Sequence, residues 1–443
     1  MYTETQCRDL VERVVRLSKA DEVHVSLNFD EVVHQRFARN CPSTAGLVSS
    51  VTVSVRSTFG TRTATSQGNQ FSGGALEDIV RSSEELARAG PEDPEFQPAL
   101  GEQVFVEVPE GAPESEAERL EHLTQGIALV IGRALRSGYV AAGFAQARDS
   151  VRCIANAAGL FGYQRTSDAH FAETVRTPDG AGSGWASTAS IRARDLDFEG
   201  PTTTAISKAR GSLNARTFAP GDYPAVLEPA CVASLMGLLM GSMDMRQADE
   251  GRSFFSLPEG QTRLGEKLFP ESISLHSDPA DPTVPALRWS ADGVPHAPTS
   301  WIDKGVLANL HCNRYWGREH SRPLLPRPPN TLLRGGNETL AELIAGTERG
   351  LLVTNLWYMR GVDTKTMLYT GLTRDGLFWI EDGKVTHPVN NFRWNDSPIR
   401  VLQNTEALSR PMRIGGRNGR TLSALVPALR VKSFGFTSIS DAV

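Results

Sequence analysis

Histidine and cysteine are the residues of this chain whose side chains could bind a catalytic metal. The 443 residues include nine histidines and five cysteines. No two histidines have the His-x-x-x-His or His-Glu-x-x-His spacing that places two imidazoles on one helix face. The best cluster is His311, Cys312, Glu319 and His320. These residue types can bind zinc, so the cluster is a candidate metal site, but a loop or surface role for this arginine-rich stretch is the simpler interpretation.

Other hydrolytic and nucleotide-dependent chemistries have no support in the sequence. There is no Gly-x-Ser-x-Gly segment of the kind that carries a serine nucleophile. The glycine-rich stretch Gly180–Gly184 is not followed by the Lys-Ser/Thr pair of a phosphate-binding loop. Serine hydrolysis and ATP-dependent action are therefore not expected from this chain.

Length and composition indicate a soluble protein with two domains, or one large domain with a second layer. The net charge of −5 and the absence of a basic block argue against nucleic acid as the main partner. The five cysteines are scattered without C-x-x-C spacing, which suits reduced thiols in the cytoplasm. The polar N-terminus lacks an apolar signal core. The most apolar stretch, Ala225–Met243, is interrupted by Glu228 and several small residues, so no membrane span is expected.

Hydrophobic periodicity predicts an α+β fold in the first half of the chain. Helices are expected at 5–17, 76–89, 116–135 and 201–210, and strands at 23–29, 47–58, 63–67, 139–147, 151–155, 159–174 and 186–192. The segment 91–113 is rich in proline and glutamate and is expected to connect elements at the surface. We therefore predict an N-terminal α/β domain with a mixed sheet and helices, residues 1–215.

The second half, residues 216–443, is predicted to be a β-rich domain. The run 350–358 is typical of a strand, and 376–385 predicts a hairpin because Asp382 and Gly383 suit a tight type I′ turn. Three prolines within 324–334 predict an extended connection or a loop. The segment Pro229–Asp244 is the exception to the β pattern, since its apolar residues recur at helical spacing.

Several blocks, in the same order along the chain, resemble the TldD/PmbA family of metallopeptidases. They are Arg36–Asn40, Val51–Arg56, Pro91–Phe96, Asn156–Gly159, Gly182–Trp185, Gly265–Glu266, Pro329–Asn330, Gly350–Val353, Gly371–Pro388, Pro427–Val431 and Phe436–Ser438. The resemblance implies the TldD/PmbA fold, an α+β N-terminal domain followed by a β-rich domain. It also implies that paired chains enclose a substrate cavity.

The zinc motif of the active family members is missing. Their His-Glu-x-x-x-His falls on the segment that begins at Met236, so the two histidines correspond to Met236 and Gly241 and the general-base glutamate to Gly237. Their late cysteine ligand has no counterpart, because the last cysteine is Cys312. Thioether and glycine offer almost nothing to zinc. The resemblance therefore implies a TldE-type subunit with no catalytic residue and no metal of its own.

Such a subunit is expected to partner a TldD-type subunit that carries the zinc. The family's substrates are unfolded peptides, including precursors of peptide natural products, and release of a product from a peptide-like carrier is a related expectation. The alternative is a stand-alone homo-oligomer that binds peptides or acts as a scaffold. A third hypothesis, an independent hydrolase that uses His311 and His320, has the least support.

Peptide binding would use a sheet edge and the side chains beside it. Edge pairing gives affinity to an extended peptide without selecting its sequence. The expected edges are 351–359 and 377–384. The candidate substrate-binding residues are Trp357, Tyr358, Arg360, Arg374 and Trp379; the alternative is that the aromatic residues belong to the core and the arginines are solvated.

Overall fold

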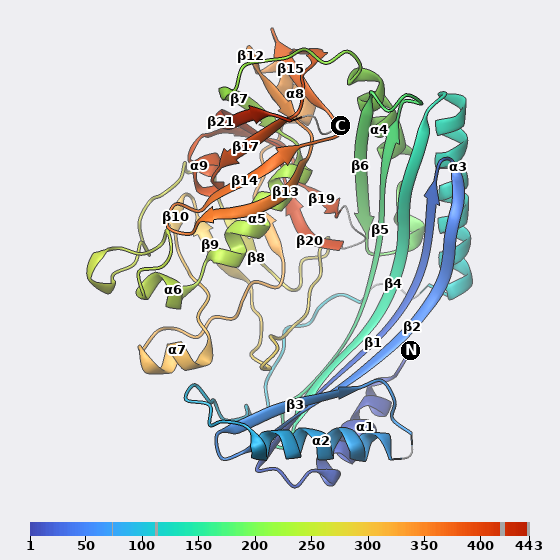
Figure 1. Cartoon of the computed structure of the whole chain (residues 1–443). Coiled ribbons are helices and arrows are strands. Elements are labelled where there is room, and N and C mark those ends of the chain that lie inside the picture. Colours follow the sequence, from blue (N-terminus) through green and yellow to red (C-terminus); the bar gives the residue numbers. More distant parts are fainter. Residues whose placement is uncertain (73, 111–113, 417–420, 441–443) are drawn as a thin grey trace.

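The computed structural model describes residues 1–72, 74–110, 114–416 and 421–440. A long curved sheet with helices at one end and along one face is built from the first half of the chain (Figure 1). The second half forms two further sheets that enclose a helix. The α+β prediction, with a β-rich second half, is confirmed. Among the described residues, no helix combines the length and the apolar character needed to cross a membrane.

The first sheet is antiparallel throughout and has the order β3-β2-β1-β4-β5-β6. Arg39 and Asn40, both at positive φ, form the tight turn between its first two strands. From Glu22 to Arg36 the register of β1 on β2 is continuous. The strands are β1 (Glu22–Ala38), β2 (Cys41–Phe59), β3 (Arg62–Gly68), β4 (Val140–Asn156), β5 (Phe161–Arg176) and β6 (Ser183–Ser190).

Strand β4 is one continuous element, whereas the sequence predicted two strands separated near residue 149. The polar residues that suggested a break are paired inside the sheet. The Arg119 guanidinium lies 2.8 Å from an Asp149 carboxylate oxygen. The Ser150 hydroxyl donates to Asp30 at 2.6 Å. Because Asp149 and Ser150 each have a partner, the strand runs through the predicted break.

Helices cover the first sheet in two places, and their apolar faces explain where they pack. Helices α1 (Glu4–Leu17) and α2 (Ala75–Ala89) share a core with the lower ends of the strands. Helix α3 (Glu116–Arg136) lies along the sheet at the right of Figure 1 and packs with α4 (Glu199–Gly211) over Val33 and Phe171. Thr3 and Ser115 form capping boxes at the starts of α1 and α3.

The second half contains a six-stranded sheet, β10-β9-β8-β11-β20-β19, and a nine-stranded sheet, β13-β14-β17-β21-β7-β12-β15-β16 with β18 paired to β21. The strands are β7 (Gly221–Leu227), β8 (Leu275–Ser277), β9 (Thr299–Asp303), β10 (Val306–Leu307), β11 (Thr331–Leu333), β12 (Arg349–Val353), β13 (Leu356–Asp363), β14 (Leu368–Thr373), β15 (Leu377–Glu381), β16 (Lys384–Pro388), β17 (Phe392–Asp396), β18 (Thr405–Leu408), β19 (Met412–Gly415), β20 (Thr421–Val426) and β21 (Leu429–Ile439). The helices are α5 (Pro229–Ser242), α6 (Met245–Asp249), α7 (Arg314–Glu319), α8 (Leu340–Ala345) and α9 (Pro398–Gln403).

The strand predicted at 350–358 is two strands, and this changes which edges are open. The chain leaves β12 at Val353, passes Thr354 and Asn355, and begins β13 at Leu356. Strand β12 lies inside the sheet, between β7 and β15, and β15 lies between β12 and β16. The segment predicted as an edge at 351–359 begins with β12, which is an interior strand, so the prediction is wrong for that half. The prediction of an edge at 377–384 is wrong for β15, which is also an interior strand. In the described part of the chain, the two ends of this strand order are β13 and β16. The hairpin turn at Asp382 and Gly383 is confirmed, with both residues at positive φ.

One carboxyl group is buried in the core between the first sheet and α4. Glu173 is 1% exposed and lies on β5 between Phe171 and Val175 on the same face. Neither of its carboxylate oxygens accepts a hydrogen bond of ordinary geometry. Burial raises the pKa of Glu173 to about 7, an effect that the nearby Thr202 hydroxyl only partly offsets. The chain therefore carries a carboxyl that is mostly protonated below neutral pH.

Replacing Glu173 with glutamine should flatten the pH dependence of stability. The carboxyl ionises near pH 4.5 when unfolded and near 7 when folded, so the wild-type chain should lose stability as the pH rises through this window. The loss should approach about 3 kcal/mol. In urea unfolding, the free energy of unfolding of E173Q relative to wild type should be more favourable at pH 8 than at pH 5. The control E77Q, at an exposed glutamate, should follow wild type at both pH values. An E173Q chain that is no more stable at pH 8 would contradict the assignment.

Candidate functional site

Helix α5 carries the positions that the resemblance matches to the zinc motif, and it is a core element. It begins with Pro229 at its first turn, where the absent N–H costs nothing. Its predicted apolar stripe is buried between the sheets, and Met236 and Leu239 have no exposed surface. The Met236 side chain therefore belongs to the core.

The opposite face of α5, called the bare face below, has glycines at positions 237 and 241 and so lacks side chains there. Gly237 and Gly241, one turn apart, lie on the exposed side of the helix. A Cβ atom added at either position would meet no other atom within 4 Å. The neighbouring hydroxyls of Ser234 and Ser242 donate to carbonyl groups of their own helix. At this face the helix offers backbone and space but no side chain that could bind a metal or move a proton.

The alternative metal cluster is not assembled. His320 stacks on Trp316 with ring centroids 3.8 Å apart, and Glu319 pairs with Arg318. Burial, with the charges of Asp249 and Asp244, raises the pKa of Cys312 to about 11, so this thiol stays protonated. Within the described ranges, no group of three or more histidine, cysteine or carboxylate side chains is placed to hold a metal.

His311 instead belongs to a small backbone ladder at the end of α5. Its N–H donates to the Met243 carbonyl and its carbonyl accepts from the Met245 N–H, both at 2.9 Å. On the other side, Cys312 exchanges two backbone hydrogen bonds with Leu325. The proline-rich segment 326–330 forms neither helix nor strand, in agreement with the prediction of an extended connection or loop, and β11 follows it. The ladder fixes Asp244, His311 and this segment against one another.

Asp244 is the polar centre of this ladder. Its carboxylate caps α6 by accepting from the Gln247 N–H at 3.0 Å, and an oxygen lies 3.1 Å from His311 Nε2. Arg327 reaches the same carboxylate at 3.4 Å and also donates to the Gly241 carbonyl at 3.3 Å. Burial acts to raise the pKa of Asp244, but the contacts with His311, Gln247 and Arg327 outweigh it and hold the pKa below its usual range. The carboxylate is therefore ionised and structural.

A cavity of about 480 Å³ opens beside this ladder. Its apolar wall includes Leu287, Trp289, Val294, Leu324 and several prolines, and its polar groups include Asp244, His296, His311, Arg314 and Arg327. A mostly apolar cavity of this size with a few fixed polar groups is typical of a ligand-binding site. Since Arg327 contacts both Asp244 and Gly241, the cavity adjoins the end of α5 that carries the bare face.

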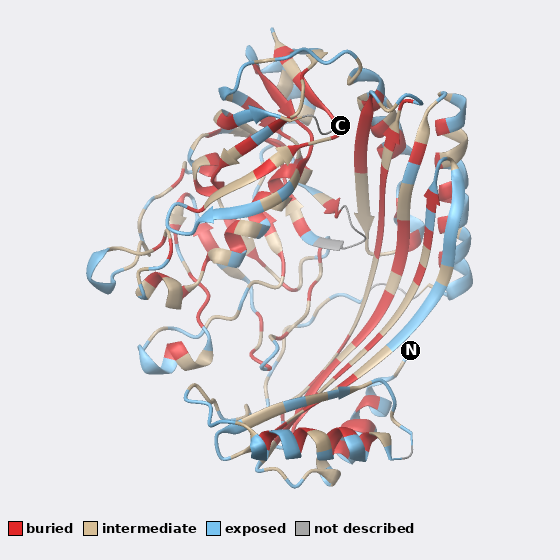
Figure 2. Cartoon of the chain, viewed as in Figure 1, coloured by how far each residue is buried: buried red, intermediate tan, exposed pale blue. Residues whose placement is uncertain are grey.

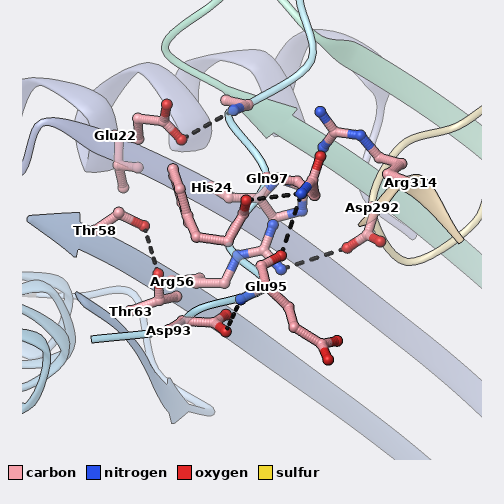
Figure 3. Close-up of a pocket in the computed structure, with 13 residues that line it drawn as sticks. Glu22, His24, Arg56, Thr58, Thr63, Asp93, Glu95, Gln97, Asp292 and Arg314 are labelled. Atoms are coloured by element: carbon pink, nitrogen blue, oxygen red, sulfur yellow. Dashed lines mark hydrogen bonds and ion pairs between the residues drawn. The ribbon is translucent and has the colours of Figure 1, made fainter. Parts of the chain in front are cut away.

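A smaller cavity of about 170 Å³ lies between the lower end of the first sheet and loops of the second half (Figure 3). Arg56 of β2 pairs with Asp292 at 3.5 Å across it. Burial, together with the charge of Arg56, lowers the pKa of His24 to about 4, with Asp292 opposing, so this imidazole is neutral. Asp292 and Arg314 line both cavities, which are therefore neighbours.

Arginine contacts join the two halves of the chain around the smaller cavity. Arg314 donates to the Pro98 carbonyl at 2.6 Å. Arg246 of α6 pairs with Glu95 at 2.9 Å. The connection at 91–110 is thus fastened to the C-terminal half, which places the lower end of the first sheet beside the ladder.

The predicted substrate-binding residues fall into two groups. Tyr358, 62% exposed, and Arg360 lie on edge strand β13, with the guanidinium 4.9 Å from the tyrosine ring. Arg374 lies 5.7 Å from the Trp357 ring beside them. Trp379 is elsewhere, packed on Phe218 with ring centroids 4.9 Å apart. The structure therefore brings four of the five together beside β13 and leaves Trp379 in an aromatic cluster.

Sequence reasoning missed Asp244 and Arg327. The signal for Asp244 was present, because an aspartate three residues before Gln247 is typical of a helix N-cap. Arg327 carried no comparable signal. It reaches Asp244 only because the ladder folds residues more than eighty positions apart onto one another.

The comparisons identify the family. The sequence profile of the PmbA/TldA metallopeptidase C-terminal domain matches residues 220–438. A metalloprotease from Methanothermobacter thermautotrophicus is 27% identical over 189 residues, which are 38% of this chain and 39% of that protein. The match thus spans well under half of that relative's length. The chain belongs to the TldD/PmbA family, as the sequence blocks predicted.

Solved structures share the fold across nearly the whole chain. TldE from Thermococcus kodakarensis superposes with a TM-score of 0.84 at 17% identity, covering 97% of this chain and 100% of that one. A Thermotoga maritima protein described as a proposed modulator of DNA gyrase gives 0.82 at 16% identity, covering 97% and 99%. At these identities the likeness establishes the fold.

Replacing Asp244 with alanine should destabilise the ladder. The change removes the cap of α6 and the partner of a buried imidazole, at a cost of about 1–3 kcal/mol. Asparagine retains the capping oxygen and should cost less. Denaturant unfolding of D244A, D244N and wild type would test this order, and a D244A chain as stable as wild type would contradict the central role of the carboxylate.

Proposed function

We propose that this chain is the non-catalytic, TldE-type subunit of a two-component zinc metallopeptidase. A TldD-type subunit would supply the zinc and the general base. This chain would complete the substrate cavity, hold the catalytic subunit in its active form and engage an unfolded peptide. The substrates would be unfolded peptides, including precursors of peptide natural products, in the cytoplasm.

The proposal rests on the residues that α5 has at the positions matched to the zinc motif. Hydrolysis by a zinc peptidase needs ligands, a metal-bound water and a base beside it. At the matching positions this helix has a methionine committed to the core and two exposed glycines with open space around them. No other metal-ligating cluster is formed within the described residues. The helix thus keeps its structural role and lacks the groups for chemistry.

The bare face would suit close approach of a backbone. Glycine lets a main chain come nearer than any other residue. Edge strand β13 contacts α5, and the cavity beside Asp244 adjoins the end of the helix at Gly241. An extended peptide paired with β13 would lie beside a strand that packs on α5, and the apolar cavity could receive one of its side chains.

Zinc content would test the division of labour. Elemental analysis should find no stoichiometric zinc in the isolated chain, and about one zinc per pair in a complex purified with a TldD-type subunit from the same genome. Peptidase activity should appear only in the complex. A full equivalent of zinc in the isolated chain would overturn the proposal.

The β13 edge should contribute to peptide turnover by the complex. Replacing Tyr358 and Arg360 together with alanine should lower kcat/KM for an unfolded peptide roughly tenfold, because contacts beside the paired strand are lost. The zinc content should not change. Val385, exposed on the opposite edge β16, gives the control V385A. If both variants kept wild-type kcat/KM, peptide binding at β13 would be excluded.

A further inference from the structure

One wall of the cavity of about 480 Å³ is a short hairpin, residues 288–296. The Ser290 N–H donates to the Val294 carbonyl at 2.9 Å. The His296 N–H donates to the Arg288 carbonyl at 2.8 Å. The tip of the hairpin is exposed, and most residues behind it are buried or half-buried (Figure 2). Backbone hydrogen bonds therefore fix this wall.

A second stretch that lines the cavity, 311–329, is fixed as well. Cys312 and Leu325 exchange two backbone hydrogen bonds across it. Between the two stretches the surface is mainly apolar, and its apolar residues include Leu287, Trp289, Val294, Leu324, Pro326, Pro328 and Pro329. Because both walls are held by the backbone, the cavity is formed before a ligand enters it.

The charged groups that line the cavity already have partners. The Asp244 carboxylate lies against the His311 imidazole and the Arg327 guanidinium. Asp292 pairs with a guanidinium at 3.5 Å, and Arg314 donates to a backbone carbonyl at 2.6 Å. A charged ligand would have to replace one of these contacts. The cavity therefore favours a neutral ligand.

His296 is the buried polar side chain that keeps a free acceptor. It is 7% exposed, and its Nδ1 lies 2.7 Å from the Leu287 carbonyl oxygen. A carbonyl can only accept, so Nδ1 carries the proton. Burial lowers the pKa of His296, and the bond to Leu287 opposes this only in part, so the ring is neutral. Nε2 then has a lone pair, and within the described residues no group donates to it.

We propose that this cavity binds a neutral aromatic ring that carries a hydrogen-bond donor, a phenol or an indole, with the donor directed at Nε2 of His296. The Trp289 ring and the three prolines provide apolar surface against which a ring can pack. A ring without a donor would cut Nε2 off from solvent and leave it unpaired, which costs free energy. An O–H or N–H group removes that cost.

Two sources can supply this chemistry. One is the side chain of a tyrosine or tryptophan in a peptide, and the other is a free small molecule. The first source rests on the proposed function, since it would make the cavity a subsite that selects among unfolded peptides. Binding of the ring itself does not depend on a catalytic partner.

Binding of p-cresol and toluene to the isolated full chain tests the role of His296. In ligand-observed NMR titrations p-cresol should bind saturably, with a Kd on the order of 1 mM. H296N keeps an N–H for the Leu287 carbonyl but has no acceptor at the place of Nε2. It should weaken binding of p-cresol roughly threefold to tenfold, and that of toluene less than about twofold. Circular dichroism, measured in parallel, should show an unchanged fold.

A substitution at the exposed tip tests the location without changing a buried residue. Ala291 is exposed and lines the cavity, so the bulky side chain of A291W should block the entrance and abolish binding of both molecules. The matched control is A297W, at an exposed alanine just beyond the hairpin that does not line the cavity. It should bind both molecules like wild type. The proposal is overturned if p-cresol does not bind, or if either A291W or a folded H296N binds it like wild type.

Two blocked pentapeptides distinguish the sources. They are acetyl-Ala-Ala-Tyr-Ala-Ala-amide and its phenylalanine analogue. Displacement of p-cresol by the tyrosine peptide at a lower concentration than by the analogue would identify a side-chain subsite, and displacement by neither would identify a site for a free phenol. Equal displacement by both would contradict the role of the donor. These titrations use neither zinc nor a second subunit, so their failure is distinguishable from failure of the proposed function.

Discussion

The burial of α5 is the constraint on which the C-terminal half depends. The helix is enclosed by β7, β11, β19 and β20 with α9, and its apolar stripe forms the centre of the largest core. Of the three positions that the resemblance matches to the zinc motif, Gly237 and Gly241 lie on the exposed face and Met236 lies in the core. The packing of the helix does not depend on side chains at the two glycine positions, where a Cβ would meet no other atom. The fold is shared with TldE from Thermococcus kodakarensis at a TM-score of 0.84.

The backbone ladder at the end of α5 depends in turn on the carboxylate of Asp244. Asp244 follows directly on the helix, caps α6 and holds Arg327, which returns to the Gly241 carbonyl. Burial acts to raise the pKa of the Asp244 carboxyl, but its hydrogen bonds and charged neighbours hold that pKa below the usual range. Polar groups that in another protein would suggest catalysis here join three segments of chain. Their geometry shapes the wall of the adjoining cavity.

Local sequence patterns predicted the fold well where a helical hydrophobic repeat or a turn motif alone determines the structure. The stripes of α3 and α5 and the Asp382–Gly383 turn depend on neighbours in sequence, and each was read correctly. The break predicted in β4 failed because Arg119 and Asp30, remote in sequence, satisfy its central polar residues. The edges failed because edge status depends on strand order, which periodicity does not encode. Periodicity likewise does not show that Arg374 lies beside Trp357 while Trp379 packs on Phe218, because these contacts depend on strand order.

Strand order also determines what an uncharged strand can do. If Ser43–Thr52, the part of β2 that β3 does not reach, lay between two strands, its lack of charge would be ordinary, since a central strand needs no protection. At an edge the same residues expose unpaired backbone groups on a segment with no feature that opposes pairing. Strand β16, with Lys384 and a register shift, is a protected edge in the same chain. Whether an uncharged segment needs protection is therefore decided by strand order and not by the segment itself.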